Sequence, residues 1–390
     1  MIKEKKAGTK ISSVILTAAL SFVFLLFLLR SDVAINYMKN GLKLCAGTVI
    51  PSLFPFMVVS SLLVSSGVGM RLCRPLSLPA RLIFGVTEGG ACAALLGAIC
   101  GFPIGAKVAC SMYDKGMMSK KETERVLTFC NNPGSAFVIS AVGVSLFGSF
   151  KVGVILYSCV LLSALITGVL MRTLHKIDDR KITTEANLIK ARLEGSANTF
   201  SLFIGAVQDS ALSMLTVCAM VAFFSSLVGC VGVSLSALGV TEAPIAAIFG
   251  ICELSSGVSA LAALRSPYAL PLCAAALGWS GISVHCQIMA IAGGRGLSFK
   301  PYFAAKAIQG GVSAALAWTF TKLFPKACQV FSDSTPNFAQ EAQMTNAIFS
   351  LLVLFCAVAV GIAVVLGGNY RKNQGSKKSK KKIKKFSKRG

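Results

Sequence analysis

The chain has 390 residues, of which 54% are hydrophobic and 14% charged, with a formal net charge of +24. Soluble globular domains carry about 25% charged residues, so the composition excludes an ordinary soluble protein and indicates a membrane protein. The positive charge does not indicate nucleic-acid binding, because 11 of the 39 Lys and Arg lie in Arg371–Gly390 without an aromatic stacking pattern.

Residues 1–30 predict an uncleaved transmembrane helix. Four lysines precede an apolar core of about 19 residues, which is longer than the 7–15 residues typical of a signal peptide, and no small-x-small cleavage site follows. The next segment, Ser31–Leu44, has the pattern of an interfacial amphipathic helix. We expect it to lead into a helix broken by Pro51 and Pro55.

The positive-inside rule decides how the apolar segments cross the bilayer. If all ten crossed, the basic stretch Arg172–Arg192 would lie opposite the basic N-terminus. Treating 83–105 and 244–264 as re-entrant hairpins instead places 31 of the 39 Lys and Arg on the cytoplasmic side. The ten segments are 11–29, 46–66, 83–105, 126–149, 151–171, 207–233, 244–264, 269–293, 302–324 and 346–367.

We therefore predict an all-α polytopic membrane protein with about eight transmembrane helices and two re-entrant helical hairpins. The first hairpin enters from the cytoplasm and the second from the opposite face, so the halves form an inverted repeat, which supports alternating access around a midplane site. The expected regions are a transmembrane helix (1–30), a first repeat (31–171), a cytoplasmic linker (172–200), a second repeat (201–325), a transmembrane helix (326–368) and a basic cytoplasmic tail (369–390).

The first hairpin carries Gly101-Phe-Pro-Ile-Gly105. Its glycine spacing also suits close packing of continuous helices, but Pro103 removes a backbone donor and favours a break. We expect Gly101–Gly105 to form the hairpin tip. The N-terminus of a half-helix presents free N–H groups and a positive dipole end, which suits an anion.

The second motif of the first half is Asn131-Asn-Pro-Gly-Ser135. Asn132 is expected to cap a helix whose first turn holds Pro133. The alternative is an ordinary capping loop. The residues on both sides are apolar, so we expect this helix start to lie within the membrane.

In the second half, Glu253-Leu-Ser-Ser-Gly257 occupies the hairpin position, and Glu253 lies inside an apolar run. An intramembrane carboxylate is costly and by default indicates a functional site. Three roles stay open: binding a coupling cation or proton, accepting from a substrate donor, or a structural hydrogen bond to a neighbouring helix. An ionised Glu253 would repel a dianion, so it would have to be protonated, cation-bound or turned aside.

A second break is expected in Gly278-Trp-Ser-Gly-Ile-Ser-Val-His-Cys-Gln287. Gln287 has both a donor and an acceptor for substrate, whereas a lone intramembrane His285 is often a structural polar group. Outside the motifs, Lys107 either attracts an anion or extends toward the membrane boundary. Asp209 is interpreted as a helix-terminus residue favoured by the helix dipole.

Together, Pro51-Ser-Leu-Phe-Pro-Phe56, the two first-half motifs, Glu253-Leu-Ser-Ser-Gly257 and Gly281-Ile-Ser-Val-His-Cys-Gln287 occur in an order that resembles the sporulation integral membrane protein family, YlbJ type. The resemblance covers roughly residues 35–325. It implies tandem nucleoside-recognition (Gate) regions, similar to the core of concentrative nucleoside transporters. It also implies a role in spore formation and transport of dipicolinate from the mother cell across the outer forespore membrane.

The leading hypothesis is an integral membrane transporter or facilitator of a small organic anion. A cation-coupled nucleoside transporter and a non-transporting scaffold for spore formation are the alternatives. An enzyme is not expected, because the chain has no H-E-x-x-H, G-x-S-x-G or Gly-rich phosphate loop. The candidate substrate-binding residues are Gly101, Pro103, Gly105, Asn131, Asn132, Ser135, Glu253, Ser255, Ser256, Ser280, Ser283, His285 and Gln287.

The expected partners are the small anion and a bilayer whose anionic lipids meet the basic tail. No metal or cofactor is expected apart from a coupling Na⁺ or H⁺, no nucleic acid is expected, and a homo-oligomer is compatible with the sequence. The expected location is the cell membrane, and by resemblance the outer forespore membrane derived from the mother cell.

Overall fold

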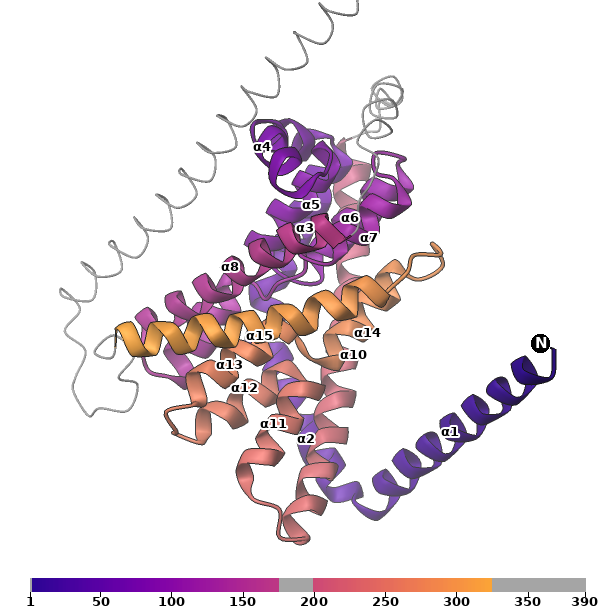
Figure 1. Ribbon diagram of the computed structural model, residues 1–390, viewed down its shortest axis with the longest axis vertical. Coiled ribbons are helices and arrows are strands. Elements are labelled where there is room, and N and C mark those ends of the chain that lie inside the picture. Colours follow the sequence, from indigo (N-terminus) through magenta and orange to yellow (C-terminus); the bar gives the residue numbers. More distant parts are fainter. Residues whose placement is uncertain (1, 175–198, 325–390) are drawn as a thin grey trace, which may run out of the picture.

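The computed structural model describes residues 2–174 and 199–324, which form an assembly of helices without strands (Figure 1). The all-α class expected from the sequence is therefore what the described residues show. The predicted C-terminal helix (326–368), the basic tail (369–390) and most of the linker (175–198) lie outside the described residues.

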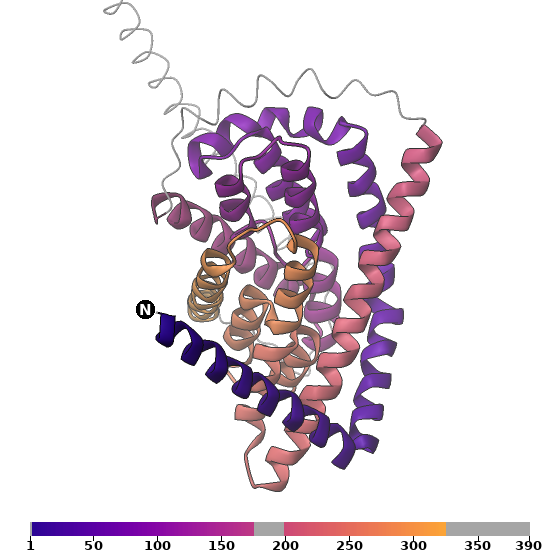
Figure 2. The same cartoon turned by 90° about the vertical axis from the view of Figure 1, so that its right-hand side faces the viewer.

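The N-terminal helix α1 (Ile2–Leu29) bends sharply into α2 (Ser31–Leu44). The angle between the two rods at this bend is 94°. Helix α2 packs lengthwise along α10 (Thr199–Ala237), as the turned view shows (Figure 2). The close approach depends on Gly41, because a Cβ there would lie 3.2 Å from the Cβ of Ser225.

Contrary to expectation, the prolines that follow α2 do not break the helix. A π-helical turn, η1 (Cys45–Val49), joins α2 to α3 (Ile50–Ser65), and the chain stays helical throughout. Pro51 lies two residues after the end of the π-helical turn, and the helix continues through it. Pro55 is accommodated inside α3, so the irregular turn lies before the prolines.

The first half of the chain contains a helical hairpin after α4 (Val68–Phe84). Its arms are α5 (Glu88–Cys100) and α6 (Ile104–Asp114). They cross where Gly97 faces Gly105, and a Cβ at Gly97 would lie 2.9 Å from the Cα of Gly105. The hairpin is longer than the predicted 83–105, because α6 continues to Asp114 as a largely buried helix.

The same order of elements occurs in both halves. After the first hairpin come α7 (Lys120–Leu127), a non-helical stretch, the π-helix η2 (Phe137–Leu146) and the long helix α8 (Phe150–Leu174). After α10 come a second hairpin, a broken helix and a long helix. These are α11 (Glu242–Cys252) with α12 (Leu254–Ala263), α13 (Ala269–Trp279) with α14 (Gly281–Ala292), and α15 (Lys300–Leu323). The order fits an internal repeat, and its inversion stays a prediction.

Among the described residues, three helical rods are long and apolar enough to cross a membrane, or up to five if each bent pair is one span. The three are Phe150–Leu174, Phe200–Ala237 and Ala269–Ala292. This supports an integral membrane protein, and the eight-span topology stays a prediction. The core has two parts, one around the first hairpin and one around the second, and Phe102 packs against both.

Candidate functional site

The tip of the first hairpin rests on the second motif of the same half. Helix α5 ends at Gly101, which has φ +84°. A side chain is excluded there, because a Cβ would collide with the backbone of Gly134. The adjacent Phe102 N–H donates to the carbonyl of Asn132 at 2.7 Å. The two first-half motifs are thus in direct backbone contact.

The two asparagines complete the end of α7 and do not begin the next helix. The side-chain amide of Asn131 donates to the Leu127 carbonyl at 3.1 Å, and that of Asn132 to the Phe129 carbonyl at 2.9 Å. The predicted N-cap role of Asn132 is therefore wrong. The last carbonyls of a helix have no partners within it, and these amides satisfy the last carbonyl of α7 and that of Phe129 in the turn after it.

Lys306 on α15 is a buried charged residue that the sequence analysis did not select. Its Nζ donates to the Asn131 carbonyl and to Gln309 Oε1, each at 2.8 Å, and its exposure is 0%. Gln309 Nε2 in turn donates to Asn132 Oδ1 at 2.7 Å. A buried polar group is costly unless hydrogen-bonded, and this network gives the Lys306 amine two acceptors behind the first break. The rule that selected Glu253, a charge in an apolar segment, would also have selected Lys306.

At the tip of the second hairpin, Glu253 separates α11 from α12 in an extended conformation. Its carboxylate accepts the N–H groups of Ser255 (3.1 Å) and Ser256 (2.6 Å), and the residue is 1% exposed. Glu253 thus caps its own helix, whereas we considered a bond to a neighbouring helix. The expectation of a free helix N-terminus fails at α12, because the chain's own carboxylate occupies it.

The second hairpin rests on the break between α13 and α14, as the first hairpin rests on its own break. Ser280 and Gly281 both have left-handed φ, at +78° and +80°. Trp279 Nε1 donates to the Ile251 carbonyl at 3.0 Å, and a Cβ at Gly281 would lie 3.0 Å from the Leu254 nitrogen. The tip of the second hairpin therefore packs against the helix break at Ser280.

All four motifs contribute to the lining of one cavity of about 30 Å³. Its wall includes Phe102 and Gly134 from the first half, Glu253 and Ser255 from the second hairpin, and Ser283 and Gln287 from α14. Motifs far apart in the sequence therefore meet at one cavity, and apolar residues of α3, η1 and α10 close its wall.

Two polar atoms in this wall lack a hydrogen-bond partner among the described residues. Within the described part of the chain, Ser283 Oγ and Gln287 Oε1 are buried without a hydrogen-bond partner. Buried polar groups in native proteins are nearly always paired with protein or water. A cavity of this size holds little more than a water molecule. In the described conformation, the cavity is therefore closed to anything much larger than a water molecule.

The remaining candidate residues shape the cavity from outside its wall. His285 Nδ1 lies 2.8 Å from Tyr302 Oη, and its ring packs edge-on against Trp279 and Phe303. Gly105 packs against the Cys130 carbonyl. The others are Pro103 before α6, Ser135 before η2, Ser256 in a hydroxyl pair with Ser225, and Ser280 at the second break.

The charged residues considered outside the motifs also lie away from the cavity wall. Lys107 Nζ donates to Ser213 Oγ at 3.2 Å. The hydroxyl of Ser213 in turn donates to the carbonyl of Asp209 at 2.7 Å. Asp209 lies within α10, about three turns after Thr199. The predicted placement of Asp209 at a helix terminus is therefore wrong, because α10 begins earlier than the apolar segment.

The chain is similar to the sporulation integral membrane protein YlbJ of Bacillus subtilis (strain 168). The two are 27% identical over 344 residues, which cover 80% of this chain and 84% of that protein. No protein-family model matches the chain, and no solved structure matches it significantly. The similarity supports the family resemblance and, with the apolar helices, an integral membrane protein.

Proposed function

We propose that this protein is a membrane transporter or facilitator of a small organic anion. The observation that carries the proposal is the meeting of four helix-breaking motifs at one cavity that contains unpartnered Ser283 and Gln287 atoms. Broken helices are tolerated at membrane depth where they line a cavity, and paired breaks in two halves of a chain are typical of transport sites.

The proposed substrate is dipicolinate, exported from the mother cell across the outer forespore membrane during sporulation. The similarity to a sporulation integral membrane protein supports this role. Lys306 adds a positive charge directly behind the Asn131 carbonyl. Attraction between unit charges is strengthened in a low-dielectric interior, so this cation favours an anion at the neighbouring cavity.

Because Glu253 lies in the cavity wall, a bound anion needs a positive charge beside it to avoid repulsion. Glu253 is 1% exposed in that wall. A dicarboxylate beside it would be repelled. We propose that a proton or Na⁺ neutralises Glu253 while the substrate is bound, which couples the two movements.

The site must enlarge during transport. A cavity of about 30 Å³ holds roughly one water, far less than an aromatic dicarboxylate. The hairpin tips close the cavity through a few backbone contacts, such as that of Phe102 with Asn132. Movement of a tip away from its break would open the site, in the way that substrate-linked loops open other proteins.

The substrate is tested with the purified full-length protein in liposomes, by measuring uptake of labelled dipicolinate and labelled uridine. We expect dipicolinate flux that falls about tenfold or more in Gln287→Leu, equivalent to roughly 1.4 kcal/mol of lost binding. The matched control is Gln208→Leu, since Gln208 is exposed on α10. Absence of dipicolinate flux in folded wild-type protein would contradict the proposal.

A cation-coupled nucleoside transporter is the second candidate. The cavity wall offers hydroxyl and amide groups beside one carboxylate, and none of its described residues is Lys or Arg. Such a wall suits a neutral polar ligand with several donors. Uridine flux without dipicolinate flux would select this candidate. A scaffold would show neither flux and would tolerate substitution of Glu253, Asn132 and Gln287.

A further inference from the structure

A larger hollow adjoins the closed cavity. It has a volume of about 490 Å³ and lies among α2, η1, η2, α10, α11 and α12. We call it the vestibule. Of the residues that the structure describes in its wall, none is charged, and many carry hydroxyl or amide groups. They include Tyr37, Asn40, Thr48, Ser145, Ser225 and Ser259.

The vestibule and the cavity share two wall residues, Phe137 and Ser255. Phe137 begins η2 directly after the first break and packs against the core of the second half. Ser255 lies in the first turn of α12 and donates its N–H to Glu253. An aromatic side chain and a serine of the second hairpin tip thus lie in the walls of both hollows.

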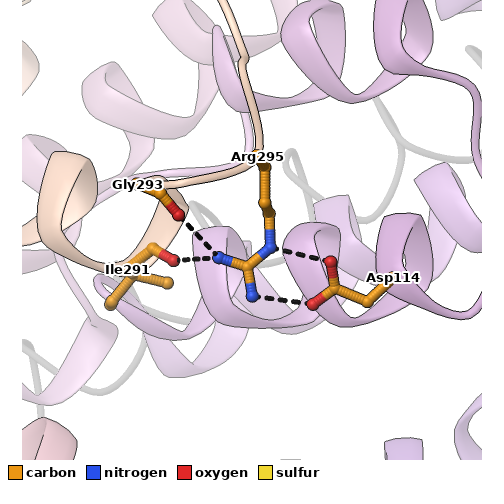
Figure 3. Close-up of polar contacts among 4 residues, drawn as sticks. All are labelled: Asp114, Ile291, Gly293 and Arg295. Carbon is orange, nitrogen blue, oxygen red and sulfur yellow. Dashed lines mark hydrogen bonds and ion pairs between the residues drawn. The ribbon is translucent and has the colours of Figure 1, made fainter.

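At the opposite end of the molecule, an ion pair joins the two halves. Arg295, in the loop between α14 and α15, donates to both carboxylate oxygens of Asp114 at 2.8 and 2.7 Å (Figure 3). It also donates to the Ile291 carbonyl at 2.6 Å. Two parallel bonds of this kind are geometrically specific, and the bond to Asp114 raises the pKa of Arg295.

A second contact joins the same loop to the first half, because the Ser298 N–H donates to Glu124 Oε1 at 2.7 Å. Asp114 ends α6 and Glu124 lies on α7. Both helices lie at the end of the molecule away from α11 and α12 (Figure 1). The loop after α14 is thus tied to the first half at the end opposite the vestibule.

We propose that the vestibule is the route by which a polar solute reaches the cavity, and that Phe137 is the barrier between them. The inference rests on the proposed function and adds its entry path. The uncharged wall, which is mainly apolar, supplies hydroxyl and amide groups along the route without trapping a carboxylate. An aromatic ring across such a route excludes water and blocks solutes until it moves.

The barrier is tested by thiol modification of the purified protein in detergent. Ser259→Cys probes the vestibule and Ser283→Cys probes the cavity. A cationic methanethiosulfonate reagent is used, and mass spectrometry locates the modified residue among the native cysteines. We expect rapid modification at position 259. At position 283 we expect slow modification that accelerates about tenfold in Phe137→Ala, with a smaller acceleration in Phe137→Leu.

The matched control is Phe150→Ala, because Phe150 is 44% exposed and lines neither hollow. It should leave both modification rates unchanged. All variants are compared by elution volume and thermal unfolding, and Phe137→Leu serves if Phe137→Ala unfolds. An unreactive position 259 overturns the vestibule as a route. If Ser283→Cys is modified equally fast with Phe137 and with Phe137→Ala, Phe137 is not the barrier.

These rates do not depend on transport. Loss of liposome flux with the expected labelling pattern would reject the proposed function and leave the accessible vestibule in place. Flux with a labelling pattern indifferent to Phe137 would reject the entry path and leave the transporter. The two failures are therefore distinguishable.

Discussion

The two halves hold their broken helices with side chains of opposite type. In the first half, the break follows α7, and Lys306 Nζ donates to the Asn131 carbonyl within it. In the second half, the first N–H groups of α12 have no partners within the helix, and the Glu253 side chain accepts from two of them. A basic side chain thus binds a carbonyl at the first break, and an acidic one binds N–H groups at the second.

The two side chains also differ in how far along the chain they lie from the break that they bind. Glu253 is local to the helix it caps, whereas Lys306 comes from α15, 175 residues after Asn131. A local cap forms with its hairpin, but a distant one requires that the first half dock on the last helix. We infer that the first break depends on tertiary assembly and the second on its own sequence.

The largest expected effect is that of Lys306→Met. The Asn131 carbonyl and Gln309 Oε1 would both lose a buried donor, at about 1–3 kcal/mol for each unsatisfied group. Thermal unfolding in detergent should shift strongly downward. Lys300→Met, at an exposed position on the same helix, should stay near wild type. An unchanged unfolding temperature for Lys306→Met would show that the first break does not need the distant cation.

The next largest effect distinguishes how tightly the two hairpin tips pack against their helix breaks. Gly101→Ala introduces a Cβ that collides with Gly134, at a left-handed φ. The left-handed conformation costs roughly 1–2 kcal/mol, and overpacking adds about 1–3 kcal/mol. At Gly281 the φ is similar but the nearest backbone atom is 3.0 Å away. Gly101→Ala should therefore unfold at a lower temperature than Gly281→Ala, and the reverse order would contradict the closer fit of the first tip.

Glu253→Ala should have a smaller effect on stability. The α12 start would lose its cap, which is worth about 0.5–2 kcal/mol. Glu253→Gln keeps one acceptor and should lose about half as much. Glu242→Ala, at an exposed position in the first turn of α11, is the control. A loss larger than that of Lys306→Met would reverse the ranking of the two breaks.

The smallest effect is expected from Asp114→Ala. Asp114 and Arg295 are 46% and 27% exposed in their ion pair, and such pairs contribute about 0–1 kcal/mol. Screening by salt should remove most of that difference. Unfolding temperatures of wild type and variant are compared at low and high salt. A large loss that persists at high salt would show that the pair contributes more than a surface contact.

The sequence located the breaks because glycine, proline and a charge in an apolar run are local signals. Gly101, Glu253 and Ser280 each mark a place where the structure interrupts a helix. Local signals did not predict which partners the polar side chains of the motifs contact. Asn132 has the residue type of an N-cap, but it faces the preceding helix and Gln309. Those partners are set by packing between distant elements.

Helix lengths were also beyond local signals. Pro51 indicated a break, but the preceding π-helical turn accommodates it and the helix continues. The first hairpin also extends beyond the predicted 83–105. Buried Val108, Ala109 and Met112 keep its second arm within the core as α6. Burial of this kind depends on neighbouring elements, which a local pattern does not include.

The most direct test of the central claim is anion flux through Glu253→Gln in liposomes, compared with wild type and Glu242→Gln. The substitution keeps the shape and one capping acceptor but removes ionisation at the cavity wall. We predict that dipicolinate flux falls about tenfold or more in Glu253→Gln that is folded and as abundant as wild type, with only the small loss of stability given above, while Glu242→Gln transports as wild type does. Wild-type flux in a folded Glu253→Gln protein would contradict the account.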